Sequence, residues 1–300
     1  MEFKKADEML ELCEKKGLTI SEIMKMRECS QFETTEDEII YKMQHAWEIM
    51  KESALGPTKN AVKSMGGLIG GEAKKLNEHR VKGKSIVGNV MAKAIAYSMA
   101  VLEVNSSMGL IVASPTAGSS GVVPGVLLAL QEEYKISDDR IIDGLFNASA
   151  IGYLAMQNAT VSGAVGGCQA EIGVAAAMAA SAATELMGGS PRECSYAAST
   201  VLMNMLGLIC DPVLGLVEYP CQNRNASGAA NALIAAEMSL SGISQMIPLD
   251  EMLECMWGNE EIYEYVKEIY KLDNDELDLV ILLVIKNINP IFNLFFDCIR

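Results

Sequence analysis

Three cysteines, Cys168, Cys210 and Cys221, carry the side chain that binds iron–sulfur clusters and other soft metal sites. Three thiolates are one ligand short of a closed four-ligand site. The wide spacings between these cysteines match no short metal motif, and free cysteines are among the most buried residue types. Spacing alone therefore leaves ordinary buried thiols open as the alternative to a metal site.

The sequence around each cysteine predicts a position at the end of a helix. Cys168 precedes the Ala-rich run 172–187 and would face the positive end of its helix dipole, which favours a thiolate. Cys210 is predicted to end the preceding helix, because Asp and Pro follow it and the residue before a proline avoids helical geometry. Cys221 is predicted in a loop before a helix at 226–240. Three helix ends that converge would assemble a three-thiol site.

A segment rich in Ser, Thr and Gly forms a second candidate element. Its hydroxyl and backbone N–H groups, with the N-terminus of a helix predicted to open near Val122, suit a substrate carboxylate. A plain turn at the start of a helix is the alternative. Arg224 is a further candidate to pair with that carboxylate, although an Arg in a loop is often solvated or bound to a carbonyl. The candidate substrate-binding residues are Ser114, Thr116, Ala117, Gly118, Ser119, Ser120 and Gly121.

Helical periodicity dominates the sequence and strand-like alternation is scarce, which predicts an all-α fold. We expect a multi-helix bundle with Gly- and Ala-rich buried helices around a cluster site. Ser190, Pro191 and Glu193 form a predicted capping box that opens one helix, and Ser137 is predicted to open another. The predicted parts are N-terminal amphipathic helices at 1–55, a catalytic helical core at 56–250 and a divergent tail at 251–300.

The composition excludes several classes of partner. A formal net charge of −15 repels nucleic acid and anionic lipid. Eight cysteines behind a charged N-terminus without a signal sequence predict a reducing compartment, so we expect a cytoplasmic protein. The apolar runs 172–183 and 277–285 are not predicted to span a membrane, because charged or polar residues bracket or interrupt them.

Four motifs in order resemble the α (catalytic) subunit of the iron–sulfur-dependent L-serine dehydratase, or L-serine ammonia-lyase, family. The resemblance covers roughly residues 1 to 250. The motifs are Glu103-Val-Asn-Ser-Ser-Met-Gly109 running into Ala113-Ser-Pro-Thr-Ala-Gly-Ser-Ser-Gly121, Gly167-Cys-Gln-Ala-Glu-Ile-Gly173, Cys210-Asp-Pro-Val-Leu-Gly215 and Glu218-Tyr-Pro-Cys-Gln-Asn-Arg-Asn225.

This resemblance implies a 4Fe-4S cluster held by Cys168, Cys210 and Cys221, with one iron open to substrate. It implies dehydration of L-serine to pyruvate and ammonia, with that iron as a Lewis acid, and a role in amino-acid catabolism that feeds gluconeogenesis. It also implies a separate β (regulatory) subunit in a hetero-oligomer. The general base is not identified by the sequence. The candidates are His45, His79, Lys59, Lys63 and the hydroxyls of the segment 114–121, called the Ser114 loop below.

Two alternatives remain at the level of the sequence. One is a pyridoxal-phosphate dehydratase with Lys59 or Lys63 as the Schiff base and the loop 66–71 as the phosphate cradle, and it requires strands. The other is a non-enzymatic zinc-binding or redox-sensing protein built on the three cysteines. The family pattern is lost from about Leu253, where acidic and then apolar sequence begins. Cys298 in this tail is a candidate fourth cluster ligand or, with Phe295 and Phe296, a packing residue.

Overall fold

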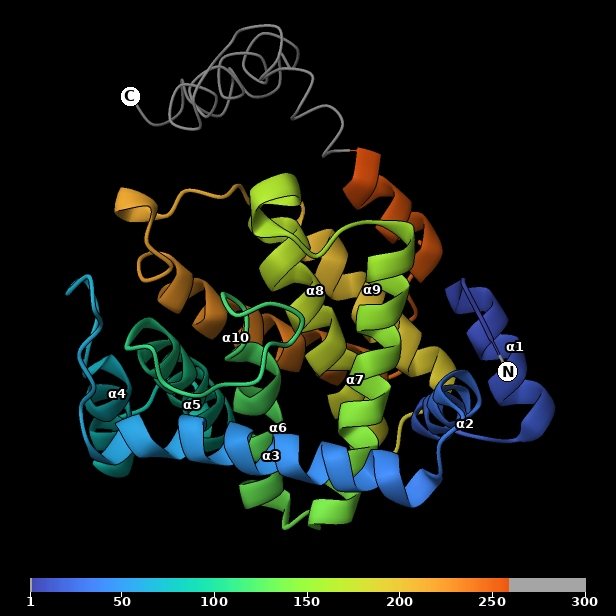
Figure 1. Cartoon of the computed structure of the whole chain (residues 1–300), viewed down its shortest axis with the longest axis horizontal. Helices are drawn as coiled ribbons and strands as arrows, with labels where there is room; N and C mark the ends of the chain where they lie inside the picture. Colours follow the sequence, from blue (N-terminus) through green and yellow to red (C-terminus); the bar gives the residue numbers. More distant parts are fainter. Residues whose placement is uncertain (1, 259–300) are drawn as a thin grey trace, which may run out of the picture.

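The computed structural model describes residues 2–258, and within this range it is built from α-helices without strands, as predicted (Figure 1). A 3-10 turn covers Val213–Gly215, and residues 249–258 are again helical. The helices are α1 (Ala6–Lys16), α2 (Ile20–Phe32), α3 (Glu36–Lys59), α4 (Glu72–Val81), α5 (Gly88–Ser106), α6 (Val122–Tyr134), α7 (Asp138–Asn158), α8 (Gly163–Leu186), α9 (Pro191–Met205) and α10 (Cys221–Leu240).

Helix α8 lies at the centre of the core and packs against α6, α7, α9 and α10. Its middle is a run of alanines, and Ala175, Ala179 and Ala182 are fully buried. Small side chains let neighbouring helices approach closely, because little volume separates the backbones. The Ala-rich sequence therefore produces a tightly packed centre around one helix.

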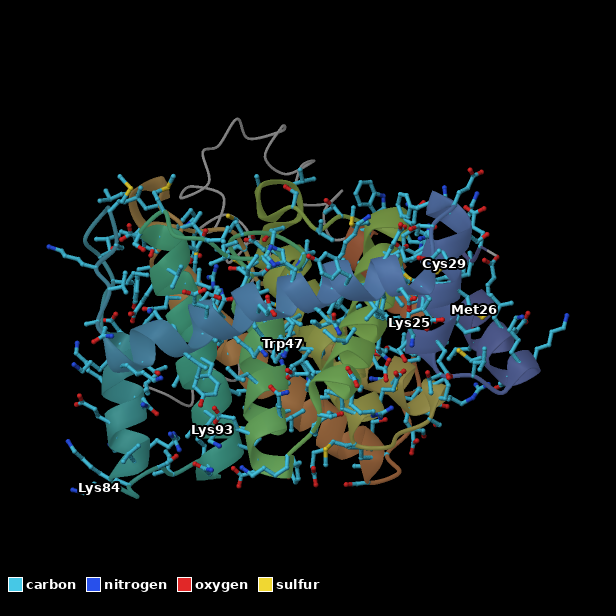
Figure 2. All side chains as sticks on the ribbon, turned by 60° about the horizontal axis from the view of Figure 1, so that its bottom comes forward. Lys25, Met26, Cys29, Trp47, Lys84 and Lys93 are labelled. Atoms are coloured by element: carbon cyan, nitrogen blue, oxygen red, sulfur yellow. The ribbon has the colours of Figure 1, made fainter. Side chains whose placement is uncertain are left out.

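The N-terminal helices α1, α2 and α3 form from the predicted amphipathic segment. Helix α3 lies across one face of the bundle, against α5, α6 and α7 (Figure 1). Trp47 points from α3 into the core (Figure 2), where it is 1% exposed and its indole Nε1 donates to Asp138 Oδ1 over 3.4 Å. Burial of this large side chain ties α3 to the start of α7.

Two predicted helix starts are confirmed by their caps. The Ser190 hydroxyl accepts from the Glu193 N–H, the Glu193 carboxylate accepts from the Ser190 N–H, and Pro191 is the first residue of α9. The Ser137 hydroxyl accepts from the Arg140 N–H at the start of α7. Both caps satisfy N–H groups that a helix cannot bond internally.

Two other predicted helix boundaries, the end of α9 and the start of α10, are wrong. Helix α9 ends at Met205, before Cys210, because Leu206 leaves helical geometry and Gly207 adopts a positive φ of 86°. Cys210 therefore lies in the loop between α9 and α10. Helix α10 begins at Cys221 itself and not near residue 226, so this cysteine occupies the first helical position.

Some predictions fall at or beyond the edge of the described range. Leu253 and Met256, at the start of the divergent tail, are buried in the core. Cys298 and the apolar run 277–285 lie outside the described residues. Among the helices of residues 2–258, none has the length and apolar character needed to cross a lipid bilayer.

Candidate active site

The structure brings the three predicted cysteines into one site. The Cys168 thiol donates a hydrogen bond to the Cys210 sulfur. Cys221 lies within electrostatic reach of Cys210, which raises its pKa. Cys168 and Cys221 are buried and Cys210 is half-buried. Residues far apart in the sequence therefore converge, and their role as ligands stays a prediction.

A break in helix α8 positions Cys168. Gly167 has φ 72° and ψ −177°, so the regular part of the helix starts again at Cys168. A Cβ at Gly167 would lie 2.7 Å from the Leu208 carbonyl oxygen, and only glycine fits both this space and this positive φ. The Gln169 N–H donates to the same carbonyl over 2.9 Å. The break therefore fixes the Cys210 loop against the start of the helix.

Arg224 links the two elements. Its Nη1 lies 2.9 Å from Cys168 Sγ, 2.8 Å from the Ile209 carbonyl oxygen and 2.5 Å from Asp211 Oδ1. Cys221 and Arg224 are three residues apart on α10 and share one helix face. Arg224 is therefore engaged with the cysteine loop, and its guanidinium favours a thiolate at Cys168.

The pKa values of the three cysteines shift in different directions. The hydrogen bond from Cys168, partly opposed by burial, lowers the pKa of Cys210 to about 7. The same bond and then burial raise the pKa of Cys168, so the pair shares a proton. Burial, with the charge of Glu171, raises the pKa of Cys221 to about 11. Binding of a metal centre by these thiolates would release the remaining protons.

The donor set fits an iron–sulfur cluster. Within residues 2–258, no three His, Cys, Asp or Glu side chains converge closely enough to hold one metal ion. A cluster tolerates wider separation, because each thiolate binds a different iron atom. Three soft sulfurs beside one guanidinium are a donor set that an iron–sulfur cluster can use.

The predicted substrate loop packs directly beside the cysteines. The Thr116 hydroxyl donates to Glu171 Oε1 on α8 and lies 3.0 Å from Ser119 Oγ. On α10, Asn225 Nδ2 donates to the Gly118 carbonyl over 2.7 Å, and Asn225 Oδ1 accepts from the Gly121 N–H over 3.0 Å. Helices α8 and α10 therefore hold both the cysteines and the loop.

Part of this loop has unused hydrogen-bonding capacity. Among the described residues, the buried Ser114 hydroxyl has no partner. The N–H groups of Ala117 and Gly118 likewise donate to no acceptor within residues 2–258. Helix α6 begins at Val122, as predicted, with its N-terminus at this loop. Free donors at a helix N-terminus can receive an anion.

Sequence reasoning missed three residues of the site. Glu171 lies three positions after Cys168, and Asn225 four positions after Cys221, which are the helical spacings that place side chains on one face. Glu218 is the third, and its carboxylate accepts from the Ser64 hydroxyl and from the N–H groups of Gly66 and Leu68 over 2.6–2.9 Å. Helical spacing was the signal for the first two residues, whereas Glu218 opened the motif 218–225 without a role being assigned to it.

The position of Glu218 also argues against the pyridoxal-phosphate alternative. The Gly-rich loop that would hold a phosphate is bound to this carboxylate instead. The strands required by that alternative do not form within residues 2–258.

The four candidate bases lie outside the site network. His45 and Lys59 are exposed on α3, His79 is exposed on α4, and Lys63 is exposed in the loop that follows α3. His45 lies near Glu48, with Nδ1 3.8 Å from its carboxylate. No hydrogen bond or ion pair in the described range joins any of the four to the cysteines or to the Ser114 loop.

Comparison with known proteins agrees with this site. Residues 15–271 match the family described as serine dehydratase alpha chain. The chain is 45% identical over 255 residues to a probable L-serine dehydratase alpha chain of Bacillus subtilis (strain 168), with 85% of each chain covered. It is 43% identical over 254 residues to the L-serine dehydratase alpha chain of Peptoniphilus asaccharolyticus, covering 84% of this chain and 86% of that one.

A longer relative matches over only part of its length. The L-serine dehydratase of Streptomyces coelicolor (strain ATCC BAA-471 / A3(2) / M145) is 36% identical over 261 residues, which cover 85% of this chain and 56% of the relative. The family match spans most of the sequence, including all three cysteines and the Ser114 loop. The chain therefore belongs to the serine dehydratase alpha chain family.

Proposed function

We propose that the chain is the catalytic α subunit of an L-serine dehydratase, an L-serine ammonia-lyase that converts L-serine to pyruvate and ammonia. The observation that carries this proposal is the convergence of three thiols and an anion-receiving loop on α8 and α10. The names of the relatives support the same reaction.

Cys168, Cys210 and Cys221 would hold a 4Fe-4S cluster. When bound, this cluster would supply a Lewis-acidic iron that makes the serine hydroxyl a better leaving group. Arg224 keeps Cys168 and the Cys210 loop in register and adds positive charge beside the sulfurs. Cys298 remains a candidate fourth ligand that serine would displace.

The Ser114 loop would bind the substrate carboxylate. Its free donors are the Ser114 hydroxyl and the N–H groups of Ala117 and Gly118, and Asn225 fixes the loop from α10. Thr116, Ser119, Ser120 and Gly121 shape the loop through bonds among themselves and to α8 and α10. The loop thereby orients the Cα–Cβ bond of serine beside the cysteines.

The partner would be a separate β subunit. The chain covers 80–86% of relatives named alpha chain, but only 56–60% of relatives named simply L-serine dehydratase. We infer the β subunit from the name alpha chain that these relatives carry, with L-serine as the small-molecule partner and no role for nucleic acid or membrane. A cytoplasmic location follows from the cysteine usage.

Pyruvate formation tests the proposal. The chain would be purified without oxygen, reconstituted with iron and sulfide, and assayed with L-serine in the presence and absence of the β subunit. We expect pyruvate and ammonia in equal amounts, with strong dependence on the β subunit. Absence of pyruvate from fully reconstituted protein with its β subunit would refute the assignment, and binding of zinc without sulfide would favour the sensor alternative.

A further inference from the structure

Glu171 is an acid of the site whose negative charge has no positive partner among the described residues. It is half-buried on α8, and no Lys, Arg or His nitrogen in residues 2–258 lies within 4.0 Å of its carboxylate. The guanidinium of the site, Arg224, is already bonded to Cys168, Ile209 and Asp211. An uncompensated carboxylate beside several thiols is unfavourable unless a cation binds there.

The surrounding residues leave space for this carboxylate. A Cβ added to Gly118 would lie 2.6 Å from Glu171 Oε1, and one added to Gly163 would lie 2.6 Å from Oε2. Glycine at both positions therefore makes room for the two carboxylate oxygens. The hydroxyl of Thr116 bonds Oε1 and fixes the side chain against the loop. The carboxylate is thus held in place by one neutral donor.

Groups that attract an anion and a group that attracts a cation therefore meet at Gly118. Its own N–H and that of Ala117 are free to receive an anion, while the carboxylate of Glu171 faces the same residue. An α-amino acid carries a carboxylate and an ammonium on one carbon, so a single molecule can satisfy both groups. A simple carboxylic acid would satisfy the donors and be repelled by Glu171.

We propose that Glu171 binds the α-ammonium group of the substrate and makes the site selective for amino acids over other carboxylates. The inference rests on the proposed function, because it places the amino acid in the same site. Glu171 contacts the substrate, and its charge determines the class of substrate, an α-amino acid zwitterion.

Binding of two non-reactive probes tests this role. L-Alanine and propionate share a carboxylate and a carbon skeleton, and differ only in the ammonium group. The dissociation constants of both would be measured by calorimetry on cluster-loaded protein carrying Glu171→Gln, with Glu237→Gln on the exposed face of α10 as the matched control. Iron content and circular dichroism would verify the loaded, folded state of each protein.

The expected result is a loss of L-alanine affinity of roughly tenfold or more in Glu171→Gln, the range for a hydrogen bond to a charged group. Propionate should bind the variant at least as tightly as it binds the parent, because repulsion is removed. Glu237→Gln should change neither constant. If Glu171→Gln does not fold, Glu171→Asp is used instead. Its shorter side chain keeps the negative charge but moves it away from the ligand, and it should lower the affinity for L-alanine alone.

Two results would overturn the inference. Equal L-alanine affinity in the parent and in Glu171→Gln, while the parent still forms pyruvate from serine, would remove the role of Glu171 and leave the proposed function intact. Parallel weakening of L-alanine and propionate would show a structural role for Glu171. A parent that binds neither probe and forms no pyruvate would refute the proposed function together with the inference.

Discussion

The two ends of α8 hold the same kinds of side chain but differ in chemistry. The N-terminal end carries Cys168 and Glu171 beside Arg224 and a loop with free donors. The C-terminal end, about 20 Å away along the helix, carries Glu185 within electrostatic reach of Cys13 and Cys194. Both regions therefore combine buried thiols with a glutamate, and the first also adjoins a loop with free donors.

The C-terminal end is a closed polar cluster. Glu185 is 4% exposed, and its Oε2 accepts from Asn147 Nδ2 over 2.6 Å and from the Ser21 N–H over 3.3 Å. Burial, followed by the charge of Glu185, raises the pKa of Cys13 to about 12 and raises that of Cys194 well above its usual value. Burial therefore favours the protonated form of both thiols.

Residue type alone does not distinguish the two ends, because both carry cysteines and a glutamate while their surroundings differ. At the N-terminal end, the break at Gly167 and the loop after α9 bring backbone and sulfur together, and Arg224 adds positive charge. At the C-terminal end, regular helices surround the thiols with apolar side chains. We propose that the broken helix and the nearby cation distinguish the metal-binding thiols from the packing thiols.

The largest effect should follow from removing one site thiol. Cys210→Ala is expected to abolish the cluster absorbance and the bound iron, because two thiolates cannot hold the cluster. Cys194→Ala, at the other end of α8, should retain both. The measurement is iron content and visible absorption after anaerobic reconstitution. Full retention of the cluster in Cys210→Ala would contradict the ligand assignment.

A smaller effect is expected from the charge that distinguishes the two ends. Arg224→Gln keeps hydrogen-bonding capacity but removes the cation beside Cys168, and a hydrogen bond to a charged group contributes on the order of 2 kcal/mol. The cluster should therefore be lost roughly tenfold faster in air than in the parent. Arg192→Gln, an exposed arginine paired with Glu14, is the control. Equal cluster lifetimes in Arg224→Gln and Arg192→Gln would show that Arg224 does not help to retain the cluster.

The smallest effect concerns two buried glutamates with opposite pKa shifts. Burial raises the pKa of Glu185, so its protonated form is favoured in the folded chain. Its contribution to stability is present below the ordinary glutamate pKa and is lost as the pH rises through the raised value. Glu185→Gln should therefore increase the unfolding free energy near neutral pH by on the order of 1 kcal/mol relative to its effect in acid.

The pKa of Glu218 shifts in the opposite direction to that of Glu185. Burial alone would raise its pKa, but the hydrogen bonds from Ser64, Leu68 and Gly66 outweigh burial and lower it. Its stabilisation is present above the ordinary glutamate pKa and is lost as the pH falls through the lowered value. Glu218→Gln should thus destabilise the chain at neutral pH and less so in acid, as measured by urea unfolding across pH. Parallel pH profiles for the two variants would contradict this contrast.

The sequence predicted those features that depend on local pattern. The all-α class, the caps at Ser190 and Ser137 and the start of α6 follow from periodicity and from side-chain chemistry near each helix end. The end of α9 at Met205 and the start of α10 at Cys221 were missed. Gly207 follows the end of α9 with a positive φ, and its N–H donates to Gln169 Oε1 on α8, a contact that local pattern does not reveal.

The partners within the site were less accessible to sequence reasoning. The bond between Arg224 and Cys168 joins residues on different helices, and one sequence gives no sign of such a contact. The same holds for Glu218 and the loop that begins at Ser64. Helical spacing from Cys168 could have indicated Glu171, because residues three apart share a helix face.

Iron and sulfide analysis of the anaerobically reconstituted chain, combined with its absorption spectrum, tests the central claim most directly. We expect about four iron and four sulfide per chain, with a visible absorption that disappears when the iron is removed by a chelator. Serine-dependent pyruvate formation should disappear with it and return when iron and sulfide are restored. Pyruvate formation by protein free of iron and sulfide would show that the reaction needs no cluster.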